Sequence, residues 1–89
     1  MQKREIAINN RLGLHARSSA KIVQLASRFR SHVTLAYGGR RASARSIVAV
    51  MLLAASVGST IVLEAEGPDE TDAMAAMVAL IDARFGEHH

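Results

Sequence analysis

The stretch Gly13-Leu14-His15-Ala16-Arg17 carries the side chains with the clearest chemical potential in this sequence. An amphipathic pattern without proline or glycine predicts a helix over residues 16–28, which places His15 near the helix N-cap. The first N–H groups of a helix lack intrahelical partners, and together with the helix dipole and the Arg17 guanidinium they favour a phosphate-like dianion. A nucleophilic imidazole in such an anion site indicates a histidine that carries a phosphoryl group.

Length and composition limit what else the chain can be. With 89 residues we expect a single domain (residues 1–89) with one modest core. The absence of cysteine excludes a disulfide framework or thiolate metal site, and His15 and His32 lack the nearby carboxylates of a metal site. The first residues are too polar for a secretory signal, and the apolar run at residues 47–55 is too short to span a bilayer. We expect a soluble, cytoplasmic monomer without membrane insertion.

Charge is divided unevenly along the chain. Residues 1–50 hold ten Lys or Arg and a single acid, Glu5, whereas residues 51–89 hold one basic residue, Arg84, and seven acids. A basic half can bind nucleic acid or acidic proteins. Because the arginines are scattered and only 3% of residues are aromatic, we favour acidic protein partners over nucleic acid.

The elements that must position His15 follow from periodicity and turn residues. Alternating patterns predict strands at residues 4–8, 32–37, 40–44 and 60–65, with a tight hairpin turn at Gly38-Gly39. A last helix is predicted after Asp69, which should cap it, and Gly86 should stop it. Its apolar stripe comprises Met74, Met77, Val78, Ile81 and Phe85. We expect residues 87–89 to form a disordered tail. The order β-α-β-β-α-β-α predicts a two-layer α+β fold in which the helices pack on one face of an antiparallel sheet.

Ser46 precedes a short apolar segment and is a favoured N-cap residue, which predicts a helix from residue 47 to about 54 or 55. The β-branched residues of this segment would also suit a buried strand. We expect Val50 and Leu53 to join the core, and Ile47, Val48 and Met51 to form an exposed docking surface for partners. A phosphate on Ser46 would face free N–H groups and add roughly −1.5 to −2 charge beside that surface. A plain helix cap is the simpler alternative.

Several stretches together resemble the HPr family, the histidine phosphocarriers of the bacterial phosphoenolpyruvate:sugar phosphotransferase system. They are Asn10-Arg11-Leu12-Gly13-Leu14-His15-Ala16-Arg17, its Ala20-Lys21-Ile22-Val23 continuation, and Ala44-Arg45-Ser46-Ile47-Val48-Ala49-Val50-Met51 with Gly58 beyond. The resemblance runs essentially end to end. It implies an open-faced sandwich in which three helices cover one face of a four-stranded antiparallel sheet of order 1-4-2-3.

The resemblance also implies a function. His15 would accept a phosphoryl group on Nδ1 from phospho-Enzyme I and pass it to an Enzyme II A component for sugar uptake. Arg17 would stabilise the phosphate, helped by the backbone N–H groups of Ala16, Arg17 and Ser18. Ser46 would be the site that a serine kinase, with a matching phosphorylase, modifies to regulate the carrier. Such a protein is a phosphoryl carrier and protein substrate rather than an enzyme, and needs no cofactor or metal.

Other functions stay open at this point. Ser18 stands where the family most often has proline. Unlike proline, serine has a backbone N–H, and this group could face the phosphate. Residues 54–59 resemble carriers of Gram-negative lineages, so a nitrogen-type regulatory phosphotransfer carrier is an alternative. A small basic nucleic-acid-binding domain would explain the charge, but the sequence lacks a Gly-x-x-Gly clamp and an aromatic platform. A regulatory partner acting through Ser46 alone would leave His15 unexplained.

Overall fold

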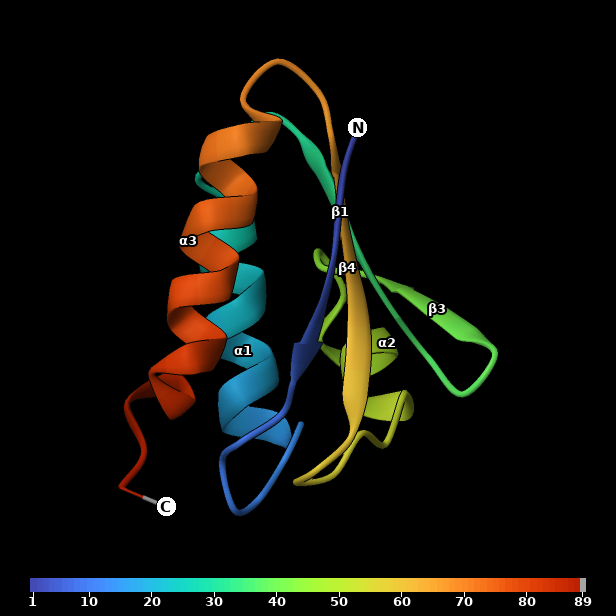
Figure 1. The fold of residues 1–89 in the computed structure, drawn as a ribbon, viewed down its shortest axis with the longest axis vertical. Coiled ribbons are helices and arrows are strands. Elements are labelled where there is room, and N and C mark those ends of the chain that lie inside the picture. Colours follow the sequence, from blue (N-terminus) through green and yellow to red (C-terminus); the bar gives the residue numbers. More distant parts are fainter. Residues whose placement is uncertain (89) are drawn as a thin grey trace.

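The computed structural model describes residues 1–88. Its elements, shown in Figure 1, are β1 (Gln2–Ala7), α1 (Ala16–Ala26), β2 (His32–Tyr37), β3 (Arg40–Ser43), α2 (Ile47–Leu52), β4 (Thr60–Glu66), α3 (Glu70–Asp82) and a short 3₁₀ turn, η1 (Arg84–Gly86). The predicted order of strands and helices is therefore confirmed, including the choice of helix over strand after Ser46.

The four strands form one antiparallel sheet of order β1-β4-β2-β3, as predicted. β4 is central, with Ile61 opposite Ile6 of β1 and Leu63 opposite Leu35 of β2. All four side chains are buried and share one face, because residues two apart along a strand point the same way. β2 and β3 are joined through Gly38 and Gly39, whose φ angles of 61° and 79° suit the predicted hairpin turn.

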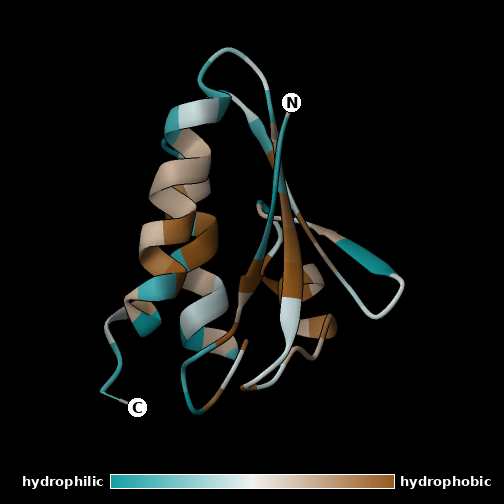
Figure 2. Ribbon diagram, viewed as in Figure 1, coloured by the Kyte–Doolittle hydropathy of each residue, from teal (hydrophilic) through white to brown (hydrophobic). Residues whose placement is uncertain are grey.

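The helices cover the apolar face of this sheet. Figure 1 shows α1 and α3 side by side along it, and α2 packs against α1 and β3. Hydrophobic residues follow β4 and the middle turns of the helices in Figure 2. Every residue of the predicted stripe is buried: Met74, Met77, Val78, Ile81 and Phe85. Val50 and Leu53 are buried in the same core, as predicted.

Some element ends differ from the predictions. α1 ends at Ala26 rather than at residue 28. α2 ends at Leu52, because the N–H groups of Leu53 and Ala54 bond to carbonyls three residues back and Ala54 adopts a φ of 56°. The prediction that Gly86 ends the last helix is wrong for α3, which ends at Asp82. Gly86 instead ends the separate turn η1, with a φ of 77°.

Asp69 stands at the N-cap position of α3, but its side chain makes no capping bond to that helix. Its carboxylate instead accepts hydrogen bonds from the backbone N–H groups of Arg30 (2.9 Å) and Ser31 (2.8 Å). The capping prediction is therefore wrong for the side chain. Asp69 ties the start of α3 to the turn between α1 and β2, and these bonds, led by that from the Ser31 hydroxyl, lower the pKa of Asp69.

Candidate functional site

His15 occupies the N-cap of α1, as predicted, with an extended backbone (φ −123°, ψ −175°). Gly13 turns the chain before it at a φ of 66°, and the Leu14 N–H donates to the Ala55 carbonyl at 2.9 Å. The first intrahelical hydrogen bond runs from the Ser19 N–H to the His15 carbonyl (2.8 Å). The N–H groups of residues 16–18 therefore have no carbonyl partner within the helix. The His15 side chain is 27% exposed, which leaves the ring within reach of another protein.

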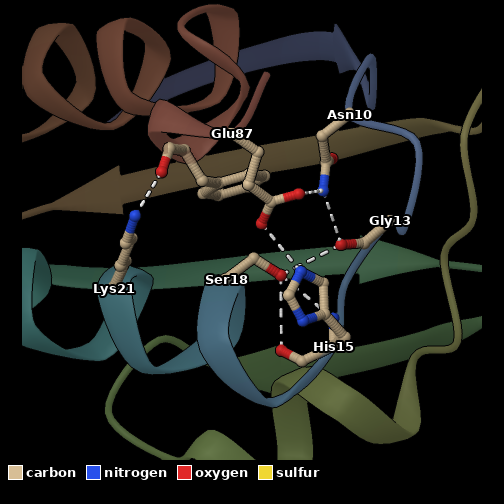
Figure 3. Close-up of polar contacts among 7 residues, drawn as sticks. Asn10, Gly13, His15, Ser18, Lys21 and Glu87 are labelled. Atoms are coloured by element: carbon tan, nitrogen blue, oxygen red, sulfur yellow. Dashed lines mark hydrogen bonds and ion pairs between the residues drawn. The ribbon is translucent and has the colours of Figure 1, made fainter. Parts of the chain in front are cut away.

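Ser18 fixes this loop through its hydroxyl, which the sequence analysis overlooked. The side chain is fully buried, and its Oγ accepts the His15 N–H at 2.9 Å. The same hydroxyl has the carbonyl oxygens of Gly13 (3.0 Å) and His15 (3.3 Å) as acceptors. These contacts, visible in Figure 3, join the glycine turn, the N-cap and the first turn of α1. A proline at this position could not make them.

The most unexpected member of the site is Glu87. One carboxylate oxygen, Oε2, lies 2.8 Å from His15 Nε2, and the other, Oε1, accepts from the Asn10 amide at 3.1 Å. Figure 3 shows the carboxylate between these two side chains. The prediction of a disordered tail over residues 87–89 is therefore wrong for Glu87, because its side chain is only 13% exposed and is bonded at both oxygens. Residue 89 lies outside the described residues.

The environment of Glu87 favours its ionised form. Burial would by itself raise the pKa of this carboxyl, but hydrogen bonds from Asn10 and His15 and the charge of Lys21 outweigh burial and hold the pKa below its ordinary value. Glu87 is thus a carboxylate at neutral pH.

His15 and Glu87 border an open hollow of about 880 Å³. Its lining comes from the loop before α1, the first turns of α1 and the segment after α3: Arg11, Leu12, His15, Ala16, Arg17, Lys21, Gly86, Glu87 and His88. Three of these residues, Arg11, Arg17 and Lys21, are cationic, and Lys21 also donates to the Phe85 carbonyl. A hollow with this excess of positive charge suits a dianion. Arg17 was predicted here; Lys21, one helical turn further on, could have been found from its i, i+4 spacing.

Ser46 and the predicted docking residues lie on α2 and do not line this hollow. The Ser46 Oγ accepts from the Ala49 N–H at 3.1 Å, which confirms the predicted N-cap. Ile47, Val48 and Met51 are 40%, 65% and 38% exposed, as a docking surface requires. Their roles toward partners stay predictions.

Within residues 1–88, no three His, Asp or Glu side chains gather as metal ligands would. In the same residues, no helix has the length and apolar character needed to cross a membrane.

Comparison with known proteins shows which family the chain resembles in sequence and structure. Residues 2–83 match the model described as "PTS HPr component phosphorylation site". The chain is 55% identical over 87 residues to Phosphocarrier protein HPr of Cupriavidus necator, covering 98% of each. It resembles the crystal structure of HPr-C-His from Thermoanaerobacter tengcongensis, with a TM-score of 0.95, 42% identity and complete coverage of both chains. An HPr dimer from that organism matches with a TM-score of 0.78, 42% identity and coverage of 98% of this chain and 100% of that one.

Relatives named phosphocarrier protein NPr, from Shewanella violacea and Proteus mirabilis, match at 41% and 44% identity. These values are below that of the Cupriavidus HPr, so the comparisons favour the HPr branch. The chain belongs to the HPr family of phosphotransferase-system phosphocarriers.

Proposed function

We propose that this protein accepts a phosphoryl group on Nδ1 of His15 from phospho-Enzyme I and passes it to Enzyme II A components. One observation carries the proposal: the partly exposed His15 ring stands at the N-cap of α1, beside the cations Arg17 and Lys21, with Nε2 already bonded to Glu87. Of the two ring nitrogens, Nδ1 is the one that Glu87 does not occupy.

The surroundings of His15 meet the electrostatic demands of phosphoryl transfer. Transfer depends mainly on position and charge neutralisation, so a carrier needs no acid–base residue of its own beyond the nucleophile. Arg17 is exposed and lines the hollow, where its guanidinium can pair with phosphate oxygens. The N–H groups of Ala16, Arg17 and Ser18 supply the positive end of the helix dipole. The protein would therefore act as a carrier and substrate rather than as an enzyme with turnover.

Docking and regulation belong to the same proposal. The exposed Ile47, Val48 and Met51 would bind Enzyme I and Enzyme II A, and the basic first half of the chain would attract acidic partners. A phosphate on Ser46 would add negative charge to that surface and weaken binding. We further propose that the carrier works as a cytoplasmic monomer, which light scattering at micromolar concentration would test.

The direct test is phosphorylation by Enzyme I and phosphoenolpyruvate, followed by intact mass measurement. We expect a gain of one phosphate that is lost in acid, as for a phosphohistidine. His15→Ala should abolish the gain, whereas His32→Ala, which removes an exposed histidine of β2, should leave it unchanged. An acid-labile phosphate on the His15→Ala protein would refute the assignment.

The NPr relatives make a nitrogen-type regulatory carrier the second candidate. Offering the phosphorylated protein to sugar-type and nitrogen-type Enzyme II A proteins separates the two, because the proposed function requires faster transfer to the sugar-type acceptor.

A further inference from the structure

We propose that Glu87, held in place by Asn10, keeps the His15 proton on Nε2 and thereby leaves the lone pair of Nδ1 free to attack phosphorus. This inference rests on the proposed function of His15 and assigns two positioning residues to it. The sequence analysis gave neither side chain a role at the site, and Glu87 is 72 positions away from His15 in the sequence.

The first step is the bond between Glu87 and the ring. An ionised carboxylate can only accept hydrogen bonds, so at 2.8 Å from Oε2 the Nε2 atom must carry the hydrogen. A neutral imidazole has a single N–H, which leaves Nδ1 as the unprotonated nitrogen. The carboxylate thus selects one of the two neutral forms of His15, and it is the form that can react through Nδ1.

The second step is the orientation of Asn10. Its side chain is fully buried, and its Nδ2 donates both to the Gly13 carbonyl (2.9 Å) and to Glu87 Oε1 (3.1 Å). Both partners are acceptors, so the NH₂ group must face them and the amide cannot be turned around. In this orientation the buried Oδ1 has no hydrogen-bond partner among residues 1–88, which is unfavourable for a buried polar atom. Asn10 therefore links Glu87 to the glycine turn that carries His15.

The third step follows the proton and electron pairs through a transfer cycle. The Nδ1 lone pair forms the new N–P bond while the donor's bond to phosphorus breaks, and the proton stays on Nε2. The ring becomes cationic beside the Glu87 carboxylate, which is the only acid among the described residues that line the hollow. When the acceptor attacks, the Nδ1–P bond breaks and its electron pair returns to the ring. Because Nε2 still holds its proton, the group that leaves is neutral imidazole rather than imidazolate, which is a far poorer leaving group.

Glu87→Gln gives the sharpest test. The fixed Asn10 amide requires the Gln oxygen on its side, so the Gln NH₂ group must face His15 Nε2 and donate to it. The His15 proton should then move to Nδ1, which blocks the nucleophile. In serine-protease triads an equivalent carboxylate-to-amide exchange, which also reverses a histidine tautomer, slows the reaction about 10⁴-fold. His15 needs no proton transfer, so we expect a smaller effect, a phosphorylation rate lower by about tenfold or more.

Two measurements are needed, the ¹⁵N resonances of the His15 ring in the unphosphorylated protein and the single-turnover rate of phosphorylation by Enzyme I. Glu64→Gln is the matched control, because Glu64 is also 13% exposed and ion-paired, to Arg41 at 3.0 Å, but lies on β4 away from the hollow. We expect wild type and Glu64→Gln to show protonated Nε2, and Glu87→Gln to show protonated Nδ1 with slower transfer.

An unchanged tautomer in Glu87→Gln would overturn the inference, whether or not the rate fell. Asn10→Ala should weaken the preference for Nε2–H without reversing it, because Glu87 loses one of its two anchors. If wild-type protein took up no phosphate on His15, the proposed function would fail, while the ring resonances would still report whether Glu87 sets the tautomer.

Discussion

Gly13→Ala should be among the most damaging single-methyl additions in this protein. The residue has a φ of 66°, where a side chain costs about 1–2 kcal/mol. The new Cβ would stand 2.6 Å from the Ala55 carbonyl oxygen and 2.8 Å from Ser56 Cα, both backbone atoms that must move. Such overpacking costs about 1–3 kcal/mol, and moving the Ala55 carbonyl also endangers its bond from the Leu14 N–H, worth about 1 kcal/mol.

These contributions predict a loss of about 3–6 kcal/mol. A domain of this length is typically stable by about 4–13 kcal/mol, so a large part of its stability would disappear. Urea unfolding followed by circular dichroism measures the loss. Gly38→Ala is the control, because its φ is 61° but no atom lies within 4 Å of the added methyl, which leaves only the cost of about 1–2 kcal/mol for the backbone. If the two variants differed by less than about 1 kcal/mol, the close approach of the loop between α2 and β4 would not be the reason that position 13 requires glycine.

Three further predictions follow from contacts described above. Arg17→Ala should slow phosphorylation by about tenfold or more in a stopped-flow assay and leave the urea midpoint nearly unchanged, because the side chain is exposed; marked unfolding would make Arg17 structural. Ser46→Asp should weaken Enzyme I binding in calorimetry at low ionic strength, with most of the loss recovered in salt; a salt-independent loss would contradict the electrostatic explanation. Asp69 has a pKa below its ordinary value, so it stabilises the fold above the unfolded-state pKa of about 3.9, and that stabilisation disappears as the pH falls through the lower native value. Asp69→Asn should reduce the free energy of unfolding at pH 7 and flatten its dependence on acid pH. Parallel profiles of unfolding free energy against pH for wild type and Asp69→Asn would disprove the stabilising role of the Asp69 carboxylate.

Much of the fold was predictable because its signals are local. Alternation of apolar residues specifies β1, β2 and β4, and the stripe from Met74 to Ile81 specifies the buried face of α3. The expected division of α2 into buried Val50 and exposed Val48 is also confirmed, although the two stand only two residues apart. The N-cap position of His15 also followed from local sequence, since the glycine turn and the first apolar residue of α1 flank it.

The rest of the site was not predictable, because it depends on contacts between distant parts of the chain. Asn10 and Glu87 are 77 residues apart, and neither has a local pattern that reveals its partner. Asp69 shows the same limit: the sequence indicates an N-cap, but only the packing of α3 beside the turn after α1 shows that the carboxylate bonds to Arg30 and Ser31 instead. Ser18 was misjudged because its backbone was considered and its hydroxyl was not.

The span between Asn10 and Glu87 also has a consequence for biosynthesis. Chains are made from the N-terminus, so the loop bearing His15 leaves the ribosome long before Glu87 does. β1 likewise waits for β4, since Ile6 pairs with Ile61. A nascent chain can thus display His15 before its carboxylate partner has been translated, and the imidazole acquires its hydrogen bond to Glu87 only after the 72 residues that follow His15 have been added. Partners that require the bond between His15 and Glu87 would then distinguish chains that already include Glu87 from shorter nascent chains.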